Sequence, residues 1–135
     1  MPFGKAALLY GLTVPVFFAV DMVWLGLIAK PFYAKQIGHM MAAKVRWTPA
    51  LLFYLLYIAG ILFFAVLPAL DKGSLGRAVL SGALLGLLAY ATYDLTNLAT
   101  LRDWPLLVTM IDLVWGMVLT GGVAAASYLI AGRIF

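Results

Sequence analysis

Three aspartates lie inside long apolar runs of this sequence: Asp21, Asp94 and Asp112. The only other acidic residues, Asp71 and Asp103, lie in short polar breaks, and the chain has no glutamate. An ionisable side chain in hydrocarbon is costly, so such a residue usually marks a functional site. No lysine or arginine lies in the interior of the same runs. We therefore expect these three carboxyls to carry the chemistry of the protein.

Few arrangements can hold three buried aspartates that have no basic partner. The acids can be protonated, because burial disfavours the charged form, or they can share protons as a coupled group. They can also bind a hard cation such as Na⁺, Mg²⁺ or Ca²⁺ through oxygen ligands. A purely structural alternative is that they hydrogen-bond neighbouring helices. Ion pairs are a further solution, with basic residues reaching in from a nearby loop: Lys35, His39 and Arg46.

The composition is that of an integral membrane protein. Of the 135 residues, 66% are hydrophobic and only 10% are charged, whereas a soluble domain is about half apolar and about a quarter charged. The absence of cysteine excludes disulfides and thiolate chemistry. No phosphate-binding loop or zinc-protease motif is present, so we expect no cofactor. We attribute the net charge of +4 to orientation and lipid contacts rather than to nucleic acid.

Four apolar runs are each long enough to cross a membrane as a helix. They cover residues 6–29, 49–70, 75–100 and 105–132, and they lack the strict alternation of strands. Short turns join the last three runs, which should therefore be antiparallel neighbours. Residues 1–135 are predicted to form one all-α domain, an integral membrane four-helix bundle. Local signals place helix starts at Pro49 with Thr48 as the N-cap, after Ser74 and at Pro105, and a kink at Pro15.

The segment 30–47 between the first two runs differs from the other connections in length and charge. Its basic, aromatic and aliphatic residues are typical of an amphipathic helix lying at the membrane interface. We expect it to contact the anionic headgroups of membrane lipids. Aromatic residues near the span boundaries are interpreted as interface anchors: Tyr33, Trp47 and Trp104.

Positive charges hardly discriminate between the two sides of the membrane. The density of charge in segment 30–47 favours a cytoplasmic location for it, with both termini outside. Four spans are few for a monomeric transporter, so we expect a homodimer, and the near balance of charge permits an antiparallel one. The basic residues on the side of that segment are Lys30, Lys35, Lys44, Arg46 and Arg102, and those on the other side are Lys5, Lys72, Arg77 and Arg133.

The three aspartates are predicted to lie at one depth. Counted from the nearest span ends at about 1.5 Å per residue, all three lie roughly 9–12 Å below the boundary on the side of segment 30–47. Exposure to lipid would cost about 2.5–3.5 kcal/mol for each charged group, so they must face inward. Helical spacing gives two matching inward faces: Gly82, Gly86, Tyr90 and Asp94 on the third span, and Thr109, Asp112, Gly116 and Thr120 on the fourth.

Other side chains in the same layer complete the predicted site. Tyr54 and Tyr57 fall at this depth on the second span, and Asn97 shares the helix face of Asp94. We expect tyrosine and asparagine side chains to be hydrogen-bond partners and two tryptophans to form walls. The candidate ligand- or ion-binding residues are Asp21, Asp94, Asp112, Asn97, Tyr54, Tyr57, Tyr93, Trp24 and Trp115, and no catalytic residue or metal ligand is assigned.

A short motif, Asp-x-Val-Trp, occurs at residues 21–24 and again at residues 112–115. The first and fourth spans run in opposite directions, so the two copies are consistent with the relic of an inverted repeat. The simpler interpretation is local, because an indole N–H three residues from a buried carboxyl is a convenient donor.

The stretch TYDLTNLATLRDWP at residues 92–105, together with the two Asp-x-Val-Trp motifs, resembles a family of small bacterial inner-membrane proteins of unknown function. The resemblance covers essentially the whole chain. It implies four spans, a location in the bacterial inner membrane and a lipid-linked role, and it assigns no catalytic residue.

Three functions remain open at this point. The first is a site that binds a proton, a small cation or a lipid-like polar ligand and supports transport. The second is a membrane enzyme or accessory factor in lipid or fatty-acid modification, in which one aspartate acts as a general acid or base. The third is a structural partner subunit whose acids are used in helix contacts. The sequence leaves open whether the protein is an enzyme.

Overall fold

A computed structural model describes all 135 residues, which are almost entirely helical and include no strand. The first long helix is α1 (Phe3–Val23), extended by a π-helical segment, η1 (Trp24–Ile28). The second consists of α3 (Trp47–Ile61), the π-helical segment η3 (Leu62–Val66) and α4 (Leu67–Lys72). The third and fourth are α5 (Leu75–Thr100) and α6 (Leu106–Ile134), and the short helix α2 (Lys30–Ile37) and 3-10 turn η2 (Gly38–Met40) lie between the first two.

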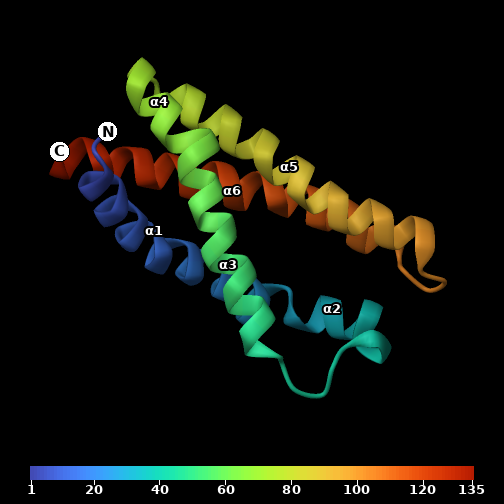
Figure 1. The fold of residues 1–135 in the computed structure, drawn as a ribbon. Helices are drawn as coiled ribbons and strands as arrows, with labels where there is room; N and C mark the ends of the chain where they lie inside the picture. The colour runs from blue at the N-terminus through green and yellow to red at the C-terminus, as the bar shows by residue number, and fades with distance from the viewer.

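The four predicted spans are confirmed. By length and hydropathy, the helices over Phe3–Ile28, Trp47–Lys72, Leu75–Thr100 and Leu106–Ile134 can cross a membrane. Both termini lie at one end of the molecule, where the ammonium of Lys5 lies 5.3 Å from the ring centroid of Phe135. The segment that contains α2 and the turn between α5 and α6 lie toward the other end (Figure 1). We call the end that holds α2 the loop side.

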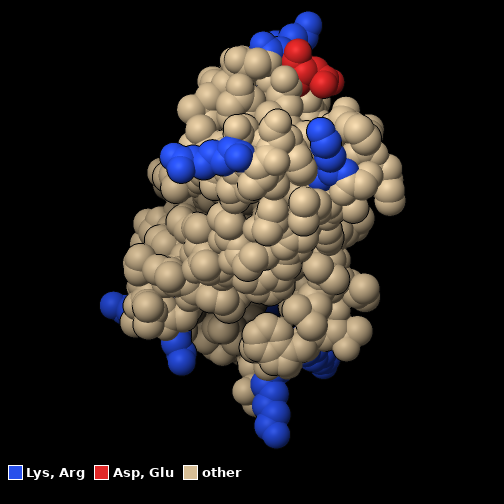
Figure 2. Space-filling model, turned by 90° about the vertical axis from the view of Figure 1, so that its left-hand side faces the viewer, with Lys and Arg blue, Asp and Glu red and all other residues tan.

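Charge is distributed as expected for a protein with an apolar body between two aqueous phases. On the face shown in Figure 2, lysine and arginine gather toward the two ends, and a band without charge separates them. Large hydrophobic side chains are exposed along all four long helices. In water such a surface would aggregate, whereas in a bilayer it faces lipid tails.

Two predictions about local structure are wrong. The interfacial helix does not extend over residues 30–47, because α2 ends at Ile37 and the backbone after η2 is irregular as far as Arg46. The helix α3 begins at Trp47, so Arg46 rather than Thr48 is the N-cap residue, and it makes no side-chain cap. The prediction for α5 is confirmed, since Ser74 Oγ accepts the backbone N–H of Arg77 at 3.1 Å.

The helices α5 and α6 lie side by side along most of their length, joined by a short turn (Figure 1). Glycines allow this close approach: a Cβ atom added to Gly82 would lie 2.7 Å from the Thr120 carbonyl oxygen, and one added to Gly86 would overlap the backbone of Gly116. Small residues permit such contact between helices in membranes. The predicted inward faces are confirmed by burial of Gly82, Gly86 and Asp94 on α5 and of Thr109, Asp112, Gly116 and Thr120 on α6.

Substitution of Gly86 by alanine tests this packing. The added methyl group must displace the backbone of α6 at Gly116, so we expect the free energy of unfolding to fall by about 1–3 kcal/mol. The matched control is Gly122→Ala on α6, where an added Cβ has no neighbour within 4 Å. Reversible unfolding in mixed detergent micelles measures both variants, and equal stability of the two would contradict the close packing.

Candidate functional site

The Asp112 carboxyl is bound by a side chain from outside the four spans. Asp112 is buried on α6, with 6% of its surface exposed. Its Oδ1 accepts a hydrogen bond from the hydroxyl of Tyr33, which lies on α2. The same hydroxyl accepts the indole N–H of Trp24 at 3.2 Å. A tyrosine of the loop-side segment therefore reaches into the bundle and contacts the acid.

Asp94 is the most isolated of the three acids. It is fully buried on α5, and neither of its carboxyl oxygens has a hydrogen-bond partner. The polar side chains that act on its carboxyl are those of Asp112 and Trp104, but the Trp104 indole donates to Thr109 Oγ1 at 3.1 Å. Two ionised carboxylates can only accept hydrogen bonds. A hydrogen bond between Asp94 and Asp112 therefore requires a proton on one of them.

No cation neutralises the carboxyls. No lysine, arginine or histidine is among the groups that act on the three acids, so the predicted option of ion pairs from Lys35, His39 or Arg46 is wrong in this arrangement. No group of three aspartate or histidine side chains is placed to hold a metal ion. The three carboxyls thus form a pair, Asp94 and Asp112, and a separate acid, Asp21, rather than a single ring.

The tryptophan of each Asp-x-Val-Trp motif forms hydrogen bonds toward the acid of the other motif, an arrangement that we call the exchange between the motifs. Trp115, from the second motif, donates its indole N–H to Asp21 of the first at 3.4 Å. Trp24, from the first motif, donates to Tyr33, and Tyr33 donates to Asp112 of the second. The local interpretation is therefore wrong, because each tryptophan serves the acid of the opposite motif. The two indoles stack at the crossing with their centroids 4.5 Å apart and their planes at 11°.

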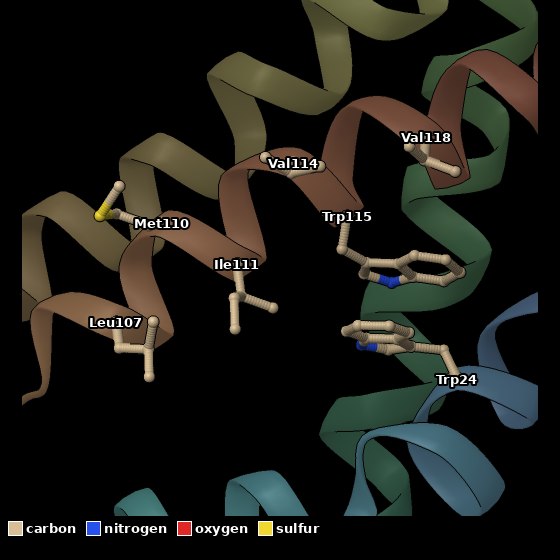
Figure 3. A pocket seen from close by; sticks show the side chains of 7 residues that line it. All are labelled: Trp24, Leu107, Met110, Ile111, Val114, Trp115 and Val118. Carbon is tan, nitrogen blue, oxygen red and sulfur yellow. The ribbon is translucent and has the colours of Figure 1, made fainter.

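A π-helical segment begins at Trp24, where α1 changes to η1. Such segments are rare and often occur at functional sites, because one widened turn shifts every following side chain around the helix axis. Here the segment stacks Trp24 against Trp115 (Figure 3) and is followed after Ala29 by α2. The backbone geometry that orients the tryptophan pair also orients Tyr33.

The remaining candidate residues divide between two parts of the site, the surroundings of Asp21 and the surroundings of the Asp94–Asp112 pair. Tyr54 lies beside the Asp21 carboxyl, whereas Tyr57 contacts Thr120 Oγ1 at 2.7 Å rather than an acid. Asn97 lies next to Tyr93, whose ring packs edge-on against Trp104. Tyr90, which packs on Gly116, lies near both Asp21 and Asp112 and joins the two parts.

The sequence interpretation missed the role of three residues. Tyr33 and Trp104 were expected to anchor the chain at the interface, but Tyr33 is bonded to Asp112 and Trp104 is buried. Thr109 accepts the Trp104 indole and donates to the Asp94 carbonyl oxygen at 3.4 Å. Thr109 lies three residues before Asp112 on the same face of α6. This spacing was the one feature of the sequence that indicated a role for Thr109 beside the acids. Trp47 is 53% exposed, as an anchor should be.

An apolar groove of about 490 Å³ lies beside the stacked indoles. Trp24 and Trp115 form one end of it, and aliphatic side chains of α6 form its length (Figure 3). All seven lining residues are hydrophobic, and none of the three aspartates lines it. The lining residues are Trp24, Leu107, Met110, Ile111, Val114, Trp115 and Val118.

The fold and the site define a multi-pass α-helical membrane protein with a pair of buried carboxyls in its bundle. Residues 6–129 match the family described as predicted membrane protein (DUF2177), and the chain belongs to that family. No curated protein and no solved structure matches the chain. The function must therefore be argued from the geometry.

Double-mutant cycles test the exchange between the two motifs. We expect Trp115→Phe and Asp21→Ala to show a coupling free energy of about 0.5–1 kcal/mol, typical of a hydrogen bond between membrane helices. The control cycle pairs Trp115→Phe with Asp112→Ala, for which no such bond exists, and its coupling should be close to zero. Unfolding free energies in detergent supply both values. Stronger coupling within one motif than between the motifs would contradict the exchange.

Proposed function

We propose that this protein binds a proton between Asp94 and Asp112 inside the membrane. The observation that carries the proposal is the environment of Asp94, which is fully buried and whose two carboxyl oxygens have no donor. Leaving a carboxylate in that state would cost several kcal/mol. A single proton shared with Asp112 removes this cost, because it converts two facing acceptors into a donor and an acceptor.

The neighbouring groups fit a pair that carries one proton and one negative charge. Tyr33 donates to Asp112 and so stabilises the charged member. Thr109 holds the α5 backbone at Asp94 and positions the second carboxyl. The nearby side chains that titrate are tyrosines and Asp21, with no lysine, arginine or histidine among them. The charge of the pair therefore changes with its proton alone.

Hydrogen bonds connect the pair to the loop side of the membrane through Tyr33 and Trp24. Toward the termini, the next polar contacts are between Tyr57 and Thr120 and between Thr13 and Ser127. Buried apolar residues of the core, including Val123 and Ala124, separate these two contacts on α6. We therefore propose that the pair exchanges its proton from the loop side, where Tyr33 contacts Asp112.

Buried acids within membrane spans often belong to proton relays in pumps and transporters. We propose transport as the activity that this site supports. Four spans are few for a transporter, so we propose that the working unit is a homodimer. From the resemblance carried by residues 92–105, we propose the inner membrane of a bacterium as its location.

Infrared spectroscopy of the protein in nanodiscs tests the proton directly. At neutral pH we expect a protonated-carboxyl C=O band in the wild type and its loss in both Asp94→Asn and Asp112→Asn, because one shared proton belongs to both acids. Asp71→Asn, at the opposite end in α4, is the control and should keep the band. Absence of the band in the wild type, or its persistence in both variants, would contradict the proposal.

The groove beside the tryptophans favours a second candidate function, the binding of an anionic lipid. Its lining is wholly apolar, as the chain of a lipid requires. The neighbouring segment 30–47 carries four basic residues and no acid, which suits an anionic headgroup. None of the three aspartates reaches the groove, so this observation supports lipid binding rather than lipid modification.

Native mass spectrometry with phosphatidylglycerol tests the second candidate. Replacing Lys30 and Lys35 by glutamine should weaken retention of this lipid by about 1 kcal/mol for each lysine. Val114→Trp should weaken it separately by filling the groove. Lys72→Gln, at the opposite end of the bundle, is the control. Equal retention by all four proteins would exclude a specific lipid site at this groove.

A further inference from the structure

The side chain of Tyr33 connects the interior of the bundle with its loop-side surface. The helix α2 lies outside the four spans, and Tyr33 is half-buried. Its hydroxyl is the one hydrogen-bond donor to the Asp112 carboxyl. Any proton that reaches the pair along hydrogen bonds must therefore pass through this hydroxyl.

Buried side chains and close helix contacts surround the carboxyl pair on its other sides. Trp104, with 8% of its surface exposed, and Thr109, with 1% exposed, cover Asp94 on the side of the turn between α5 and α6. The stacked indoles of Trp24 and Trp115 line the apolar groove (Figure 3), and neither Asp94 nor Asp112 lines it. Toward the termini, α5 and α6 are in glycine-mediated contact, and no side chain fits between them at Gly82 and Gly86.

We propose that Tyr33 is the proton gate of the Asp94–Asp112 pair and that Trp24 holds the gate closed. A hydroxyl that relays a proton must donate to the acid and, at the same time, accept from water. In the structure the accepting position of Tyr33 is occupied by the Trp24 indole N–H at 3.2 Å. Breaking that one bond frees the hydroxyl oxygen for water from the headgroup region.

The transfer leaves the tyrosine unchanged. As the Tyr33 proton moves to Asp112, a proton from water moves to the tyrosine oxygen, and the resulting hydroxide is neutralised in the aqueous phase. Release follows the reverse order. Burial and the hydrogen bond to Asp112 raise the pKa of Tyr33 well above its usual range, so a free tyrosinate is too unstable to be an intermediate and the two transfers are concerted.

This inference rests on the proton site proposed above, and its test separates the two. In nanodiscs transferred from H₂O to D₂O, the shift of the protonated-carboxyl band measures the rate of proton exchange. We expect Tyr33→Phe to keep the band and to slow its exchange by about 10²-fold or more, the usual contribution of a positioned proton-transfer group. Tyr128→Phe, on α6 near the termini, is the control and should exchange at the wild-type rate.

Trp24→Phe is a second variant, with the opposite expected effect. It keeps an aromatic ring against Trp115 but removes the N–H that occupies Tyr33, so we expect faster exchange than in the wild type. This variant decides the question if Tyr33→Phe does not fold. A wild-type band with unchanged exchange in Tyr33→Phe or Trp24→Phe would overturn the gate and leave the proton site intact. Absence of the band from the wild type would overturn both.

Discussion

The structure depends on one constraint: polar side chains in a membrane bundle must find partners inside the protein, because the surrounding hydrocarbon offers none. The helix α6 supplies most of these partners. Its Ser127 pairs with Thr13 of α1, its Thr120 with Tyr57 of α3, and its Thr109 with the backbone of α5. Each contact selects one rotation of the facing helix. Asp94 is the exception to this rule, and that exception makes the carboxyl pair a candidate for function rather than for assembly alone.

The exchange between the motifs gives the site an approximate symmetry. Two antiparallel helices each present an acid and a tryptophan, and each tryptophan bonds toward the other acid, one directly and one through Tyr33. The two arms are therefore chemically unequal. Asp21 accepts a hydrogen bond from the indole of Trp115 in a spanning helix, whereas Asp112 accepts one from the phenol of Tyr33 in a short helix outside the spans. The two matching motifs therefore form an asymmetric site, because Tyr33 lies between Trp24 and Asp112, whereas Trp115 donates to Asp21 directly.

The spans and their inward faces could be predicted from the sequence because both are local properties. Apolar length defines a span, and a spacing of four residues places Gly82, Gly86 and Asp94 on one face of α5. The division of the three acids into a pair, Asp94 and Asp112, and a separate acid, Asp21, could not be predicted in this way. The depth of a side chain in the membrane follows from counting residues along its helix. The direction in which it points across the bundle also depends on the helix crossings and on the widened turn of η1, and apolar composition reveals neither. Tyr33 was misjudged for a related reason: in a helix of eight residues, no periodicity shows how the chain folds back.

The glycine contact between α5 and α6 has a consequence for how the protein is assembled. The two helices are adjacent in the chain, so their contacts are local and carry a small cost in loop-closure entropy. A hairpin of α5 and α6 can form in the bilayer as a unit and bring Asp94 and Asp112 together before the N-terminal half has docked. The carboxyl pair is then complete early, and docking of α1 and α2 is the later event that closes it. In such an order, a newly inserted hairpin would exchange protons freely with its surroundings, and control over that exchange would be the last property that the protein acquires.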